Sequence, residues 1–244
     1  MKTEILKSLL IGCAIVLSCV ILGGAYNYKH RSANTISVTG LAEKDFSSDL
    51  IVWTASFNRF NPELKSAYAN LKSDEETIKS YLISKDIKEN EIIFSSVNMN
   101  KEFNRTYDER GNEISATFSG YNLSENVRVE SGEIDRVEKL SREVTELLEN
   151  GIELNSSAPN YYYTKLNELK IDLLARASAD AKKRAETIAG NSGSSLGDIK
   201  DATMGVFQIT GKNTNEDYSY GGVFNTSSRN KTASITLKVN YLIK

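Results

Sequence analysis

Hydrophobic residues of this chain are concentrated first in an uncharged run from Ser8 to Tyr28. As an α-helix, a run of this length matches the hydrocarbon thickness of a bilayer. Cationic residues flank the run on both sides: Lys2 and Lys7 before it, and Lys29, His30 and Arg31 after it. The pattern predicts an N-terminal transmembrane helix, with the lipid bilayer as a partner through Ser8 to Tyr28.

Two other interpretations of this run stay open. It is also compatible with a signal peptide cut after Ala25, because small residues occupy the positions before that cut. A lipid-modified Cys19 is the third interpretation. All three place residues 32–244 outside the cytoplasm, so we expect a periplasmic location in a bacterial cell envelope. The predicted division is a membrane anchor or signal segment over 1–31 and one α+β domain over 32–244.

Beyond residue 31, strands and helices alternate. Period-two hydrophobicity predicts strands at 35–40, 49–57, 91–104, 113–130, 152–166, 198–210 and 231–243. Period-3.6 patterns predict helices beginning near 61, 131 and 167. The part from 49 to 166 has the β-α-β-β-α-β order of a ferredoxin-like unit, and an α-β-β extension follows it. We therefore predict an α+β fold with a largely antiparallel sheet that the extension shares or lengthens.

Three details of this pattern carry specific predictions. The apolar positions of strand 113–130 shift by one after Gly120, which predicts a β-bulge there. Helix 167–189 is expected to bury the side that bears Ile171, Leu174, Ala181, Ala185 and Ile188. Two charge clusters on helices, Asp74 to Glu76 and Lys182 to Arg184, are interpreted as solvated faces.

Composition removes several kinds of chemistry. The chain has 244 residues and a net charge of −2, which argues against a nucleic-acid binder. Its only His is His30 and its only Cys are Cys13 and Cys19, so residues 32–244 contain neither type. That region therefore has no thiolate, imidazole or usual zinc ligand. Phosphate-binding glycine loops are also absent from the sequence. We predict no catalytic, cofactor-binding or metal-binding residues, and no cofactor.

The stretch from Gly211 to Asn230 is polar and lacks helical or strand spacing. A loop of this length is typically either a mobile tip or a binding element. Its exposed aromatics around a glycine pair give a candidate partner-contact loop, whose residues are Tyr218, Tyr220, Gly221, Gly222 and Phe224.

Two motifs carry a family resemblance. Residues 36–57 contain Val38-Thr-Gly40-Leu-Ala42 and then Asp49 to Trp53, and residues 175–199 form an alanine-spaced helix followed by a turn through Gly193, Leu196 and Gly197. This order resembles the SIMPL-domain family, formerly DUF541, which includes periplasmic 26 kDa antigen-like proteins and anchored envelope proteins of the Bacteroidetes type. The resemblance implies an exported α+β protein that assembles into rings or channels, and it implies no catalytic residues.

The patterns and the resemblance together predict a membrane-anchored, envelope-facing structural or interaction protein. The resemblance implies that it self-associates as a homo-oligomer and is linked to envelope integrity or stress. We expect no enzyme activity and no nucleic-acid partner. Two alternatives stay open: an envelope enzyme that uses carboxylate or Ser/Tyr chemistry, and a small-ligand-binding module.

Overall fold

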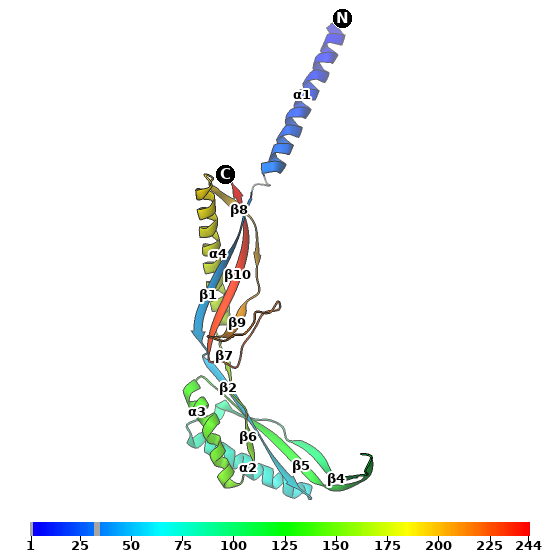
Figure 1. Cartoon of the computed structure of the whole chain (residues 1–244), viewed down its shortest axis with the longest axis vertical. Coiled ribbons are helices and arrows are strands. Elements are labelled where there is room, and N and C mark those ends of the chain that lie inside the picture. The colour runs from blue at the N-terminus through cyan, green and yellow to red at the C-terminus, as the bar shows by residue number, and fades with distance from the viewer. Residues whose placement is uncertain (1, 32–34) are drawn as a thin grey trace.

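The computed structural model describes residues 2–31 and 35–244, with side chains given over 12–26 and 35–244. The chain is elongated along one axis (Figure 1). Helix α1 (Lys2–Arg31) lies at one end, a first sheet with one helix follows, and a second sheet with two helices lies at the other end.

Helix α1 does not support the predicted membrane span. Nowhere in the described parts of the chain is a helix both long and apolar enough to cross a membrane. The predicted fold class is therefore wrong in its transmembrane helix over Ser8–Tyr28. The structure is a mixed α/β chain with antiparallel sheets.

The first sheet is built from the first strand of the domain and its last three strands. β10 runs through its centre, with β1 on one side and both β8 and β9 on the other, all antiparallel. Helix α4 covers one face. These elements are β1 (Thr35–Ser47), α4 (Leu166–Asn191), β8 (Leu196–Met204), β9 (Gln208–Gly211) and β10 (Asn230–Ile243).

The second sheet is built from the middle of the chain. β5 and β2 are its central strands; β3 and β4 pair with β5, and β6 and β7 pair with β2, again antiparallel. The strands are β2 (Leu50–Asn61), β3 (Ile92–Phe94), β4 (Asn98–Tyr107), β5 (Glu113–Ser131), β6 (Leu154–Ser156) and β7 (Asn160–Tyr162). The helical elements are α2 (Leu64–Ser84), η1 (Glu89–Glu91), α3 (Ile134–Glu143) and η2 (Val144–Asn150).

The two sheets are separate, which corrects the expectation of one shared sheet. β1, expected as a short strand over 35–40, is longer and pairs along its whole length with β10. The strand expected over 152–166 is two three-residue strands, β6 and β7, separated at the Pro159 that cannot donate to a ladder.

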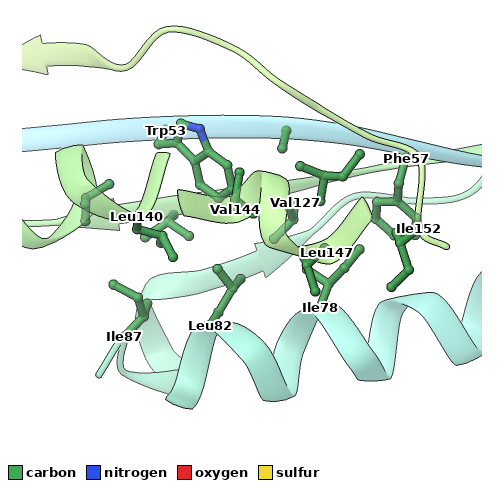
Figure 2. Close-up of a cluster of buried hydrophobic side chains, with 14 of the residues drawn as sticks. Trp53, Phe57, Ile78, Leu82, Ile87, Val127, Leu140, Val144, Leu147 and Ile152 are labelled. Atoms are coloured by element: carbon green, nitrogen blue, oxygen red, sulfur yellow. The ribbon is translucent and has the colours of Figure 1, made fainter. Parts of the chain in front are cut away.

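Each sheet has its own hydrophobic core. In the second sheet, Trp53 and Phe57 of β2 point toward α2 and the α3–η2 segment, where Leu82 and Leu147 meet them (Figure 2). The buried indole of Trp53 donates to Ser156 Oγ at 2.9 Å, so its polar N–H is satisfied. This one-sided packing leaves the opposite face of the sheet to solvent.

The first core is built for close approach. A Cβ atom at Gly40 would lie 2.1 Å from the carbonyl oxygen of Ala177 and 2.8 Å from the Cβ of Ala181. The buried side of α4 is Leu169, Leu173, Ala177, Ala181, Ala185 and Ala189. The expected burial of Ile171, Leu174 and Ile188 is therefore wrong; they are 71%, 36% and 48% exposed.

Candidate functional site

A two-stranded arm extends from the second sheet beyond its helices (Figure 1). It consists of β4 and the first half of β5, and every residue of β4 is exposed. The turn at its tip is held by Asp108, whose carboxylate accepts the backbone N–H groups of Arg110 and Asn112. Gly111 has φ +81°, which favours glycine. The arm is thus a defined ribbon.

One face of this arm, called here its apolar face, carries large apolar side chains that nothing in the described chain covers. Arg105 lies among them, opposite Ala116, and forms an ion pair with Glu113 at 2.8 Å. Phe103 on β4 pairs with Phe118 on β5, and their rings lie 5.8 Å apart. Tyr107 and Ile114 continue the same face toward the tip by period two. These four side chains are between 41% and 67% exposed. The opposite face carries Asn104, Thr106, Ser115 and Thr117. Exposed aromatic and aliphatic side chains gathered on one face, with an arginine among them, are typical of an interaction site.

At the base of the arm this apolar face opens into a groove of about 760 Å³. Leu64 and Tyr68 from the first turns of α2 form one wall, and Met99, Phe118 and Tyr121 from the arm form the other. Glu63 and Lys65 supply its charged groups. The groove suits an apolar side chain or segment more than a charged ligand.

The predicted β-bulge explains how the groove and the arm share one face. Glu102 pairs with Gly120 while Phe103 pairs with Phe118, so Ser119 is the extra residue. This confirms the bulge predicted near Gly120. A Cβ at Gly120 would lie 2.7 Å from the ring of Phe60, so the position requires glycine. The bulge puts Phe118 and Tyr121 on the same side, with ring centroids 5.1 Å apart.

The candidate partner-contact loop folds back over the helix-free face of the first sheet. Gln208 clamps it: its amide donates to Ser219 O at 2.9 Å and accepts the N–H of Val223 at 2.9 Å. Tyr220 is fully exposed, and Tyr218 accepts a bond from Ser234 Oγ at 3.2 Å.

The remaining predicted residues of that loop lie close by. Phe224 is half-exposed and forms a bridge with Ile209. Gly222 has φ +93°, whereas a Cβ at Gly221 would meet nothing within 4 Å. Tyr218 and Tyr220 border a hollow of about 410 Å³. Contact with a partner stays a prediction for these residues.

A buried lysine anchors the end of this loop, and the sequence patterns gave no sign of it. Lys231 is 2% exposed, and its ammonium donates to the Asn225 carbonyl at 2.6 Å and to Asn225 Oδ1 at 3.3 Å. Asn225 in turn donates to Glu216. Burial lowers the pKa of Lys231 to about 8, although the negative charge of Glu216 acts to raise it. The arrangement is a structural clasp between loop and strand.

Charged side chains also meet beneath α2. Asp74 is buried and forms a two-pronged ion pair with Arg59, so the prediction of a solvated face is wrong for this residue. Further along, Glu125 is 3% exposed and its Oε2 has no hydrogen-bond partner. Lys72 lies 3.8 Å from it and pairs with Glu75. Burial first, and then the Glu75 carboxylate, raise the pKa of Glu125.

Glu75 and Glu125 are two neighbouring carboxylates, as in a general acid–base catalyst, but their placement does not suit catalysis. Glycosidase-type chemistry needs both carboxyl groups to reach one substrate bond. Glu125 Oε2 is sealed from solvent, so no substrate atom reaches it in this conformation. No group of three or more metal-binding side chains occurs among the residues described here. The arm and its groove are therefore the stronger candidate site.

Comparison with models of protein families gives a match over most of the chain. The family model described as SIMPL, protein of unknown function (DUF541), matches residues 36–240. Among curated proteins, no sequence matches the chain. The matched range includes both sheets, the arm and the loop over 211–230. The family description names no enzyme activity.

Proposed function

We propose, from the premise that this chain belongs to the SIMPL family, that it is a structural or interaction protein that self-associates through the β4–β5 arm. The observation that carries the proposal is the uncovered apolar face of the arm. Two-stranded ribbons are marginally stable alone in water, and this one has no layer packed on it among the described residues. A protein partner would supply that layer.

A second copy is the partner that this surface fits. The apolar tip, with Tyr107 and Ile114, and the apolar groove, with Leu64 and Tyr68, lie on the same face of one chain. Two chains related by a two-fold axis can each place a tip in the groove of the other, which makes the contact self-complementary. Covering four half-exposed side chains is worth about 1 kcal/mol each.

The test compares two triple variants of the full chain. Phe103→Ser, Tyr107→Ser and Ile114→Ser remove the apolar face, whereas Asn104→Ser, Thr106→Ser and Thr117→Ser alter the opposite face. Both variants keep α1, so association through that helix is common to them. Light scattering after size-exclusion chromatography should show a smaller particle for the first variant only.

Two results would overturn the proposal. One is a wild-type chain that stays monomeric at all concentrations tested. The other is an apolar-face variant that keeps its oligomer size. Thermal melts of both variants, followed by circular dichroism, establish that the fold is retained.

We also propose that residues 32–244 act outside the cytoplasm, in the cell envelope. Support comes from the uncharged N-terminal run, in its interpretation as a signal peptide cut after Ala25, and from the lack of Cys beyond Cys19. The intact mass of the protein purified from its native host tests the cut. Release of the domain into the fluid when cells are converted to spheroplasts tests the location, and retention inside spheroplasts with full protection from added protease would contradict it.

A further inference from the structure

The outer edge of β1 is open where the strand begins. β1 pairs only with β10, so along its other edge every second residue turns its backbone N–H and C=O outward. Leu41 is one of these, because its N–H donates to Asp180 Oδ2 of α4 at 2.9 Å. By period two, Ser37 and Thr39 also face outward. In the described chain no hydrogen bond reaches their backbone groups.

Asp180 sets the limit of this open edge. Its carboxylate occupies the outward N–H of Leu41 and also accepts from Arg184 at 2.8 Å. At the preceding residue α4 packs directly against β1, because Gly40 has no side chain to separate them. Toward the start of β1 the larger Val38 stands between strand and helix. The strand edge is therefore closed at Leu41 and open from Thr39 to Ser37.

A groove of about 730 Å³ lies along this open part of the edge. One wall is β1 from Ser37 to Thr39, and the other is a stripe of α4 that includes Lys183, Thr187 and Ile188. Ile188 is 48% exposed and supplies an apolar surface. A strand edge beside a helix is the geometry in which an extended peptide adds to a sheet.

The charge of the groove is also defined. In the basic cluster, Lys182 has Glu186 at 3.8 Å and Arg184 has Asp180 at 2.8 Å. Lys183 forms no ion pair with any of the residues that the structure describes. The Asp180 carboxylate also lines the groove and feels the charge of Lys183, but the Lys183 ammonium is in no ion pair there and lies beside unpaired backbone groups and an apolar side chain.

We infer that this groove binds an extended peptide segment with an acidic residue, which pairs its backbone with Ser37 and Thr39. Backbone hydrogen bonds supply affinity in this mode, and side-chain pockets supply specificity. An apolar side chain of the peptide lies against Ile188, and its carboxylate reaches Lys183. The site lies on the first sheet and is independent of the proposed self-association, which uses the arm of the second.

The probe is a short fluorescein-labelled peptide that alternates valine with threonine and carries aspartates at one end. Fluorescence anisotropy measures its binding to the full chain. Two control peptides separate the contributions: one replaces the aspartates with lysines, and the other has N-methylated backbone amides. We expect both controls to bind at least about tenfold more weakly, the equivalent of about 1.4 kcal/mol.

Variants of the chain test each wall. Thr39→Pro removes one outward N–H without touching the ladder to β10, and proline is tolerated at a strand edge in that orientation. Glu43→Pro is the matched control, because its outward N–H lies beyond the Asp180 cap. Lys183→Glu leaves the backbone intact. Thr39→Pro and Lys183→Glu should each weaken the acidic peptide about tenfold or more, whereas Glu43→Pro should not.

Three outcomes would overturn the inference: no binding of the acidic peptide, equal binding of the lysine peptide, or unchanged binding by the Lys183→Glu variant. A smaller oligomer for Thr39→Pro, without peptide binding by the wild type, would instead identify a second copy as the occupant. Loss of the arm-dependent oligomer leaves this binding unaffected, so the two proposals fail separately.

Discussion

Replacing Glu125 with glutamine is expected to stabilise the protein at neutral pH. In the wild type, Glu125 is 3% exposed, and its Oε2 is buried without a hydrogen-bond partner. The attraction of Lys72 and the repulsion of Glu75 act on it in opposite directions, so the cost of desolvation is left largely uncompensated. Glutamine has nearly the same shape, carries no charge and can donate to the Glu75 carboxylate.

The size of the effect follows from the unpaired atom. A buried polar group without a partner costs about 1–3 kcal/mol, and more when charged. Because Lys72 at 3.8 Å recovers part of that cost, we expect Glu125→Gln to raise the free energy of unfolding by about 1–2 kcal/mol. In a chain of this length that raises Tm by about 2–4 °C for each kcal/mol.

The pH dependence gives a second check. The pKa of Glu125 is raised above its ordinary value of 4.5, so the folded state binds this proton more tightly than the unfolded state. Relative to a group with an unshifted pKa, protonated Glu125 therefore costs the folded state nothing below pH 4.5, and the charged form lowers the free energy of unfolding as the pH rises through the folded pKa. The advantage of the variant should therefore be full at pH 7 and disappear near pH 4.

Urea denaturation followed by tryptophan fluorescence is a suitable assay. Trp53 is the only tryptophan; it is fully buried and lies on β2, the strand that pairs with the Glu125 strand β5. Glu130→Gln, on the same strand, is the control: its partly exposed carboxylate forms only a surface ion pair with Arg128 at 2.7 Å, so stability should change by less than about 1 kcal/mol. A variant less stable than the wild type at pH 7, or a gain that persists at pH 4, would refute the reasoning.

Three shorter predictions concern the first sheet and its loop. Gly40→Ala places a Cβ 2.1 Å from the Ala177 carbonyl oxygen, so it should lower the free energy of unfolding by about 1–3 kcal/mol or more and lower Tm accordingly. The control Gly221→Ala places its Cβ in open space and should leave Tm nearly unchanged in the same thermal melts. Because the pKa of Lys231 is lowered to about 8, the wild type should gain stability relative to Lys231→Met as the pH rises from about 8 toward 10.5; equal slopes in urea titrations would contradict this. Tyr220→Ser, at a fully exposed position, should leave the melting temperature unchanged, and its effect on oligomer size by light scattering tests the partner-contact loop.

Local periodicity predicted much of the chain. The strand over 113–130 and its bulge follow from alternation alone, because a one-residue shift in a period of two needs an extra residue. The two strands of the arm follow from the strands predicted over 91–104 and 113–130. Its isolation from any helix was not, because the sequence does not show where α2 begins to cover the sheet.

Errors arose where tertiary packing overrides local preference. In α4, Ile171 and Ile188 were expected to be buried. Instead the alanine side of the helix packs on the sheet, because Gly40 has no side chain and lets the small alanines approach closely. Asp74 was expected in solvent because acidic residues usually are, and only its distant partner Arg59 explains its burial. Contacts between residues far apart in sequence leave no periodic signal.

The join between the two sheets has a mechanical consequence. β1 and β2 are one extended stretch from Thr35 to Asn61, broken only at Ser48 and Asp49, and they run through both halves of the molecule (Figure 1). A pull between the N-terminal end and the far sheet is therefore carried by covalent bonds along this stretch. The rest of each sheet is attached to this stretch by a ladder of backbone hydrogen bonds, between β1 and β10 in one sheet and between β2 and β5 in the other. A pull along the stretch loads both ladders in shear. Tension on the molecule would have to break many of these hydrogen bonds together before either half unravelled.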